Sequence, residues 1–356
     1  MFETDDLRIR ETKVLRSPEE LIAEFPVSET ASSTVFQARR QIRDILDRED
    51  DRLIVVVGPC SIHDPQAARE YAAKLLEQRQ RLDKDLLIVM RVYFEKPRTT
   101  IGWKGLINDP YLDDSYRINE GLRTARSLLL DINESGLPAG TEYLDLISPQ
   151  YYADLVGWGA IGARTTESQG HRELASGLSC PVGFKNGTSG NVQIAIDAIG
   201  SSMNAHHFLS VTKQGRSAIF ATSGNTDCHL ILRGGANHVN YDAASVDLAA
   251  DRMESSGVPV RIMIDFSHAN SCKLHARQAY VCQDVCTQLA GGDRRINGVM
   301  IESHLVSGNQ KLVKDRELVY GQSITDACID WDDTVRLLDM LAHSVQRRRE
   351  AGGEHA

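Results

Sequence analysis

The sequence lacks the features that mark membrane-spanning, fibrous and disordered proteins. No apolar run approaches the ~20 residues that a spanning helix needs. Proline and glycine do not cluster into a linker, and no internal repeat or low-complexity tract stands out. The opening residues are acidic and contain no apolar signal core, so we expect a cytoplasmic protein. With 42% hydrophobic and 25% charged residues, the 356-residue chain has an ordinary globular composition.

Positive charge is also in deficit. Lys and Arg number 40 against 49 Asp and Glu, which gives a formal net charge of −9. This balance argues against a general binder of nucleic acid or anionic membranes, although it does not exclude a small basic pocket. The 7 cysteines are odd in number and scattered, so we expect reduced, unpaired thiols.

What the chain does contain is an alternation of short apolar runs with helix-like segments. The runs are Leu53–Val57, Leu86–Met90, Ala139–Leu144, Ala160–Ala163, Pro181–Phe184, His229–Leu232, Val260–Ile264 and Gly298–Ile301. The helix-like segments are Pro65–Arg81, Ile118–Ser135, Pro149–Trp158, His171–Leu178, Val192–Ile199, Ala243–Ser256 and His275–Leu289. Eight buried parallel strands with crossover helices predict an α/β protein with a (β/α)8 TIM barrel. An open doubly wound sheet is the alternative, but no Gly-x-Gly-x-x-Gly follows an early strand.

Three segments fall outside this alternation. Residues 1–50 form an N-terminal extension with a helix-like stretch, Thr34–Arg48, ahead of a catalytic barrel over 51–346. Residues 206–222 resemble a β-hairpin with a Gly-bearing turn. Because a barrel does not need this insertion to close, we expect it to serve regulation or assembly. Residues 347–356 are expected to be a frayed tail.

Polar side chains follow the predicted strands at their carboxyl ends, where a (β/α)8 barrel has its active site. Such residues appear at seven of the eight ends. The cations expected at this mouth are Arg91, Lys96, Arg98, Arg164, Lys185 and Arg233. Six positive charges in one cleft of an acidic protein need anionic ligands, and these groups suit phosphate and carboxylate.

Candidate metal ligands come from three predicted strands that would be neighbours in a closed barrel. Cys60, His268 and Glu302 follow the first, seventh and eighth strands, and Asp326 comes later in the chain. This mixture of soft and hard donors suits one divalent Mn, Fe, Co or Zn ion with a position open for substrate. The alternative is that Cys60 packs as a small buried hydrophobe and that His268 is a satisfied core histidine.

Long motifs in the chain resemble those of type I 3-deoxy-D-arabino-heptulosonate 7-phosphate (DAHP) synthases. They are Gly58–Ser61, Arg91–Thr100, Gly102–Gly105, Gly162–Ser168, Pro181–Gly187, Leu232–Gly235, Asp265–His268 and Ser323–Cys328, and they cover essentially the whole chain. The family condenses phosphoenolpyruvate with erythrose 4-phosphate at the start of the shikimate pathway of aromatic amino acid biosynthesis. The resemblance therefore implies a metal-dependent transferase.

The resemblance also assigns roles to residues. It implies metal ligands at Cys60, His268, Glu302 and Asp326. It implies a phosphoenolpyruvate site at Arg91, Lys96, Ala163, Arg164, Lys185 and Arg233. It implies an erythrose 4-phosphate site at Lys96, Pro97, Arg98 and Thr99. Lys96 is the candidate acid for the new alkoxide, and His268 is a candidate to assist the addition of water.

Members of this family are often inhibited by an aromatic amino acid, and the chain most resembles the phenylalanine-sensitive branch. The matching or aligned effector positions are Asp5, Asp6, Tyr143, Pro149, Gln150, Leu174, Leu178, Ser179, Phe208, Ser210 and Phe220. Tyr143 and Phe220 depart from the pattern, which expects Phe and Val, so tyrosine stays open as the effector. The loop Gly235–Tyr241 also departs, because it lacks the usual Lys and has one extra residue. A homodimer or homotetramer is implied.

Two other functions compete with this interpretation. A sister synthase that uses arabinose 5-phosphate would share the barrel and the cationic mouth, but the stretch Lys96–Thr100 favours the tetrose enzyme. A non-catalytic sugar-phosphate-binding protein would be expected to lose a metal ligand or a cation, and none is lost.

Overall fold

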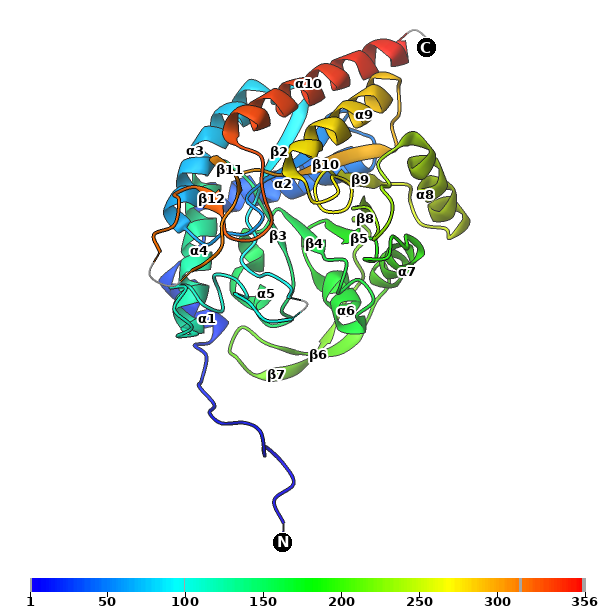
Figure 1. Ribbon diagram of the computed structural model, residues 1–356. Helices are drawn as coiled ribbons and strands as arrows, with labels where there is room; N and C mark the ends of the chain where they lie inside the picture. The colour runs from blue at the N-terminus through cyan, green and yellow to red at the C-terminus, as the bar shows by residue number, and fades with distance from the viewer. Residues whose placement is uncertain (1, 99, 314–315, 354–356) are drawn as a thin grey trace.

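The computed structural model describes residues 2–98, 100–313 and 316–353, and its centre is a closed barrel of eight parallel strands (Figure 1). The barrel strands are β1 (Leu53–Gly58), β2 (Leu86–Arg91), β3 (Ala139–Glu142), β4 (Trp158–Ile161), β5 (Val182–Lys185), β8 (Cys228–Leu232), β9 (Ile262–Asp265) and β10 (Ile296–Glu302). β1 pairs with both β2 and β10, which closes the sheet. The predicted (β/α)8 barrel is confirmed.

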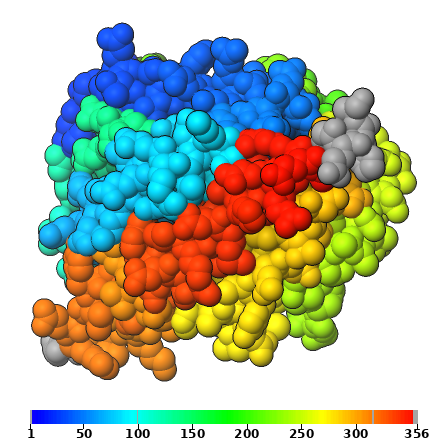
Figure 2. Space-filling model, turned by 90° about the horizontal axis from the view of Figure 1, so that it is seen from above, coloured from blue at the N-terminus to red at the C-terminus, as the bar shows by residue number. Residues whose placement is uncertain are grey.

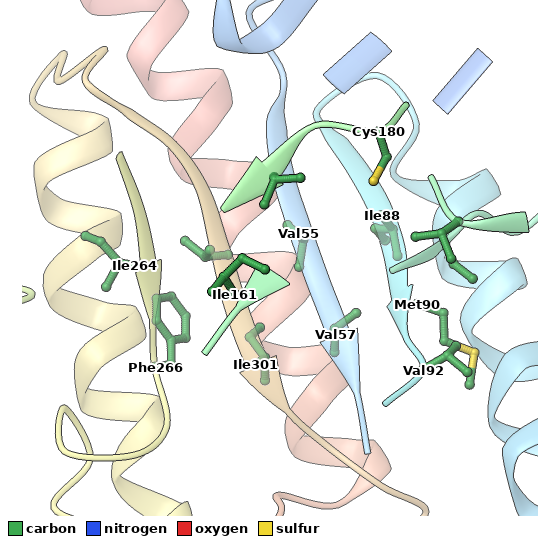
Figure 3. Packing of buried hydrophobic residues seen from close by; sticks show 14 of the residues in the cluster. Val55, Val57, Ile88, Met90, Val92, Ile161, Cys180, Ile264, Phe266 and Ile301 are labelled. Atoms are coloured by element: carbon green, nitrogen blue, oxygen red, sulfur yellow. The ribbon is translucent and has the colours of Figure 1, made fainter. Parts of the chain in front are cut away.

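Alternate side chains of each strand pack on the two faces of the barrel wall. Ile54 and Val56 of β1 belong to the cluster inside the barrel, whereas Val55 and Val57 face the surrounding helices. Figure 3 shows this outer layer, in which Val55 and Val57 lie near Ile88 and Met90 of β2. Burial on both faces explains why the strands read as continuous apolar runs.

Most helices that follow the strands begin and end close to the predicted positions, but the last of them was not predicted. They are α3 (Pro65–Arg81), α4 (Ile118–Glu134), α5 (Pro149–Tyr152), α6 (Gln169–Gly177), α7 (Gln193–Ser202), α8 (Ala243–Ser255), α9 (Gln278–Ala290) and α10 (Trp331–Gly353), with 3-10 turns η1 (Ala153–Leu155) and η2 (His275–Arg277). Asp64 caps α3, whose first residue is a proline. The predicted helix Pro149–Trp158 is too long, because α5 has four residues and β4 already begins at Trp158.

The N-terminal extension contributes two helices, α1 (Pro18–Glu24) and α2 (Glu29–Leu46). α2 covers the amino end of the barrel, where Ile42 and Ile45 join the interior cluster. The side-chain amide of Asn297, at the start of β10, donates to the carbonyl of Ile45 at 3.1 Å. Residues ahead of α1 extend away from the body (Figure 1).

The predicted hairpin is present as β6 (His207–Val211) and β7 (Ser217–Ala221), an antiparallel pair outside the barrel (Figure 1). A second small pair, β11 (Val306–Asn309) with β12 (Gln322–Ser323), follows β10 and was not predicted. The exposed side chains of Leu209 and Ile219 lie on the outer surface of the hairpin, at 85% and 74% exposure.

The prediction of a frayed tail over 347–356 is wrong for the residues that the structure describes, because α10 continues to Gly353. Arg348 is 7% exposed, and Arg349 forms ion pairs with Asp51 and Asp85 at the amino end of the barrel. Residues 354–356 lie outside the described residues. Figure 2 shows α10 (red) packed along the surface of the molecule beside α3 (cyan). Within the described ranges, no helix is both long and apolar enough to cross a membrane.

Candidate active site

The carboxyl ends of the barrel strands open into a cleft of about 880 Å³. All six predicted cations line it: Arg91, Lys96, Arg98, Arg164, Lys185 and Arg233. Pro97, Ala163, His268 and Asp326 also line the cleft, while Cys60 and Glu302 are buried and hydrogen-bonded to its lining residues. Thr99, predicted in the erythrose 4-phosphate site, lies outside the described residues. The structure thus gathers residues that are up to 266 positions apart in the chain.

The carboxyl end of β1 lies against the carboxyl ends of its two neighbours, β10 and β2. Gly58, the last residue of β1, lies opposite Glu302 of β10. Its φ is +156°, and a Cβ atom there would lie 2.7 Å from the carbonyl oxygen of Arg91. Glycine at this position therefore allows the carboxyl ends of β1 and β2 to approach closely, which brings Cys60 beside Arg91.

Two of the cations are held by buried carboxylates. Arg91 donates to Glu302 at 3.0 Å and to the carbonyl oxygens of Pro59 and Cys60, and its guanidinium lies 3.6 Å from the centre of the Tyr93 ring. Nζ of Lys185 lies 3.2 Å from the Asp265 carboxylate. These contacts fix the direction of both cations before any ligand arrives.

Three of the four predicted metal ligands form one cluster. The ligand atoms of Cys60, Glu302 and Asp326 lie within 4.8 Å of one another. Nε2 of His268 lies 3.8 Å from Glu302 Oε1, and its Nδ1 lies 2.8 Å from Asp265 and is hydrogen-bonded to Ser267. One sulfur, one imidazole nitrogen and two carboxylates fit a divalent transition ion, with Asp265 orienting the histidine.

Burial, followed by the charge of Glu302, raises the pKa of the Cys60 thiol to about 11. A thiol in this environment stays protonated at neutral pH unless a cation binds beside it. Burial would also raise the pKa of Asp265, but His268 and Lys185 hold it well below its ordinary value. The electrostatics therefore favour a carboxylate behind the histidine and a Cys60 thiol that is protonated until a metal ion binds beside it.

Lys96 connects the cationic cleft with the ligand cluster, a contact that the sequence did not reveal. Its Nζ donates to Cys60 Sγ at 2.9 Å and to Asp326 Oδ2 at 2.8 Å. Burial acts to lower the pKa of Lys96, but Cys60 and Asp326 outweigh it and raise that pKa above its ordinary value. Lys96 is thus a protonated ammonium at neutral pH, directed at the centre of the site.

Two carboxylates of the cleft were not predicted from the sequence. Glu142 is the last residue of β3, and its Oε2 lies 3.9 Å from Lys185 Nζ. The predicted run Ala139–Leu144 extended two residues too far and hid Glu142 inside the strand. Glu95 accepts a hydrogen bond from the hydroxyl of Ser148 at 3.2 Å. Burial, with the nearby charge of Asp145, raises the pKa of Glu95 to about 7.

The predicted effector residues are only partly brought together. Leu174, Phe208 and Ser210 line a cavity of about 340 Å³ between α6 and the hairpin. Phe220 packs on Phe208, with ring centres 6.0 Å apart, and the carbonyl of Gln150 accepts from hairpin Lys213 at 2.5 Å. The remaining predicted residues do not line this cavity; they are Asp5, Asp6, Tyr143, Pro149, Leu178 and Ser179.

Tyr143, where the resemblance expects Phe, is fully buried beneath this region. Its ring stacks on Tyr152 with an interplanar angle of 2°, and its hydroxyl lies 3.8 Å from Cys180 Sγ. The extra hydroxyl is therefore directed at a thiol of the protein interior.

Comparison with known proteins agrees with this geometry. Residues 24–339 match the model of the DAHP synthetase I family. The chain is 62% identical over 348 residues to the Phe-sensitive phospho-2-dehydro-3-deoxyheptonate aldolase of Escherichia coli K12, covering 98% of this chain and 99% of that one. It is 53% identical to the Trp-sensitive enzyme of Salmonella typhimurium, covering 98% and 100%.

A solved structure is similar as well. The phospho-2-dehydro-3-deoxyheptonate aldolase of Francisella tularensis superposes with a TM-score of 0.94 at 56% identity, covering 96% of this chain and 99% of that chain. Family model, relatives and fold agree over nearly the whole length. The chain belongs to the DAHP synthetase I family of enzymes.

Proposed function

We propose that the chain catalyses the condensation of phosphoenolpyruvate and D-erythrose 4-phosphate with water to give 3-deoxy-D-arabino-heptulosonate 7-phosphate and phosphate. The observation that carries the proposal is one cleft in which six cations adjoin a cluster of Cys60, Glu302 and Asp326, with His268 beside it. Two phosphorylated substrates, one of them a carboxylate, supply the negative charge that such a cleft needs.

Cys60, His268, Glu302 and Asp326 would hold the one divalent metal ion that the family implies. When bound, such an ion supplies Lewis acidity toward the aldehyde oxygen of the tetrose. In our proposal the ion is Mn, Fe, Co or Zn, since the mixed donors suit each of them.

The cations divide between the two substrates in our proposal. Phosphoenolpyruvate binds to Arg91, Lys96, Arg164, Lys185 and Arg233, with the backbone of Ala163 beside it. The phosphate of the tetrose binds to Arg98 and Thr99, next to Lys96 and Pro97. Holding both substrates lets the enol carbon face the aldehyde carbon, which is mainly an effect of proximity and orientation.

Proton transfer then follows from the positions of Lys96 and His268. The new carbon–carbon bond turns the aldehyde oxygen into an alkoxide, and the Lys96 ammonium donates the proton that neutralises it. Water adds to the former enol carbon, with His268 as the candidate that assists, and phosphate leaves from the resulting hemiketal. Support for Lys96 comes from its protonated state at the centre of the site.

Phenylalanine is the feedback inhibitor that we favour, with tyrosine as the alternative. The 340 Å³ cavity beside Phe208 is supporting evidence, as is the higher identity to a Phe-sensitive relative than to a Trp-sensitive one. Inhibition curves with all three aromatic amino acids test this proposal, and no response to phenylalanine would refute it.

We also propose a cytoplasmic homo-oligomer, at least a dimer. Leu7 and Ile9 on the extended arm are 69% and 61% exposed, and Leu209 and Ile219 are exposed on the hairpin. Exposed apolar surface of this kind is typical of a contact with a partner chain. The free thiols agree with a reducing compartment.

The decisive experiment is phosphate release from phosphoenolpyruvate plus erythrose 4-phosphate, with and without a chelator. We expect turnover that the chelator abolishes and that added divalent metal restores. Arabinose 5-phosphate is the control substrate. Faster release with arabinose 5-phosphate would favour the sister synthase, and no release with either sugar would favour a binding protein.

A further inference from the structure

A second cationic cluster lies at the opposite end of the barrel from the candidate active site. It surrounds a cavity where the carboxyl end of α2, the amino ends of β1 and β10 and the last turns of α10 meet. The lining residues are Ile45, Arg48, Asp50, Asp51, Arg52, Arg294, Ile296, Asn297, Arg348 and Arg349. Its internal space of about 60 Å³ is roughly four times the ~15 Å³ that one water needs, which is room for a compact oxyanion.

The charges around this cavity do not balance. Five arginines line it against two carboxylates, and both carboxylates are already paired. Asp50 binds Arg52 at 2.6 Å, and Asp51 binds Arg349 at 2.6 Å. Within the described part of the chain, Arg48, Arg294 and Arg348 have no carboxylate in an ion pair. The charge of Asp51 acts on Arg294 and Arg348 only at longer range than an ion pair, so three guanidinium groups around one cavity have no directly paired carboxylate among the described residues.

Arg348 makes the cluster more than a solvated surface. Arg348 is only 7% exposed, and its guanidinium donates hydrogen bonds to the carbonyl oxygens of Asp51 and Ile296, at 2.5 and 3.5 Å. Two further carboxylates near the cavity are also paired: Asp293 is bound by Arg295 at 2.7 Å, and Asp85 is bound by Arg349. A guanidinium has five N–H donors, and among the described residues the hydrogen bonds of Arg348 go to carbonyl oxygens and not to a carboxylate.

We infer that this cavity binds the oxyanion of a phosphate-bearing small molecule, either free phosphate or the phosphoryl group of an ester. Arg48 and Arg294 reach it from the rim and Arg348 from the interior, and guanidinium forks suit the oxygens of a phosphoryl group. Bound anion would join α2, β1, β10 and α10, the elements that close the amino end of the barrel. This site is separate from the cations of the cleft and is independent of the proposed reaction.

The test must first remove phosphate binding at the cleft. In an Arg98→Ala/Arg164→Ala/Arg233→Ala background, which removes cations of both proposed phosphate positions in the cleft, we would titrate inorganic phosphate by calorimetry at constant ionic strength and record the melting temperature. We expect one binding equivalent per subunit and a rise of about 1–3 °C at saturation. Arg48→Ala/Arg294→Ala, added to this background, should weaken phosphate binding at least tenfold. Both changed residues are exposed, so folding should be preserved.

The control is Arg347→Ala, which removes one arginine charge from an exposed position of α10 that does not line the cavity. It should leave phosphate binding unchanged. A second titration with ADP distinguishes the source: tighter binding than phosphate indicates a nucleotide ester, and weaker binding indicates the free ion. The inference is overturned if the background variant binds no phosphate, or if the double variant and the Arg347→Ala control bind it equally.

Discussion

Cys60 has the surroundings of a ligand, not only those of a packing residue. Its thiol is fully buried, yet Lys96 Nζ lies 2.9 Å away and Asp326 lies 3.7 Å away. A small hydrophobe in a core would have apolar neighbours instead. The residue type alone allowed both interpretations, and the polar contacts favour the first.

We therefore expect Cys60→Ala to reduce turnover at least ~100-fold, because a metal site that loses its thiolate loses most of its affinity. The measurements are phosphate release and bound metal per subunit. Far-ultraviolet circular dichroism should match the unaltered protein. Full activity together with a full complement of metal would contradict the ligand assignment.

The raised pKa of Glu95 predicts that this single residue makes the stability of the folded protein depend on pH. Its pKa in the folded protein is about 7, above the ordinary value of 4.5, so the folded state binds the proton more tightly than the unfolded state does. The free energy of unfolding, compared with that of a variant with a neutral residue at position 95, should therefore fall as pH rises from about 4.5 to 7. It should stay low above that range. The full loss is at most roughly 3 kcal/mol.

Glu95→Gln keeps an oxygen that accepts from Ser148 and removes the titration. Urea unfolding of both proteins at pH 5 and pH 8 measures the effect. The variant should gain stability relative to the unaltered protein at pH 8 and little at pH 5. An equal difference at both pH values would show that Glu95 does not titrate in this range.

At the scale of elements, ion pairs hold the end of α10 against the amino end of the barrel. Arg349 binds Asp51 and Asp85, and Asp85 is only 7% exposed. Charged residues near a chain end resemble a frayed tail in sequence, because their partners are about 260 to 300 positions away. Tertiary pairing decides that this segment is helical.

Truncation after Gln346 should lower the free energy of unfolding by about 2–4 kcal/mol, since it leaves a buried aspartate without its counter-charge. Removal of residues 354–356 is the control and should have little effect. Denaturant unfolding of both truncated proteins provides the comparison. Equal stability of the two would mean that the ion pairs of Arg349 contribute nothing measurable.

At the scale of the whole molecule, the arm and the hairpin leave apolar surface uncovered. We predict that Leu209→Ser/Ile219→Ser shifts the protein toward smaller species, because both side chains are largely exposed in the single chain. Light scattering after size-exclusion chromatography measures the mass. Leu248→Ser, at a 54% exposed position on α8, is the control. An unchanged mass in the double variant would place the interface elsewhere.

The alternation of apolar runs and helical segments determined the barrel from sequence alone. Parallel strands buried on both faces need continuous apolar stretches, and this pattern is local. The polar residues at strand ends also followed, since topology brings all carboxyl ends to one face. The long motifs then identified the family and the individual cations.

Tertiary structure alone decided which of these groups touch. Lys96 contacts Cys60 and Asp326, and Glu95 contacts Ser148. Arginines of α10 and of the connections next to α2, β1 and β10 converge at the far end of the barrel. Each contact joins residues that are distant in the chain, and its strength depends on burial and on neighbouring charge. Burial and neighbouring charge cannot be derived from composition and spacing, because both are set only when the barrel folds.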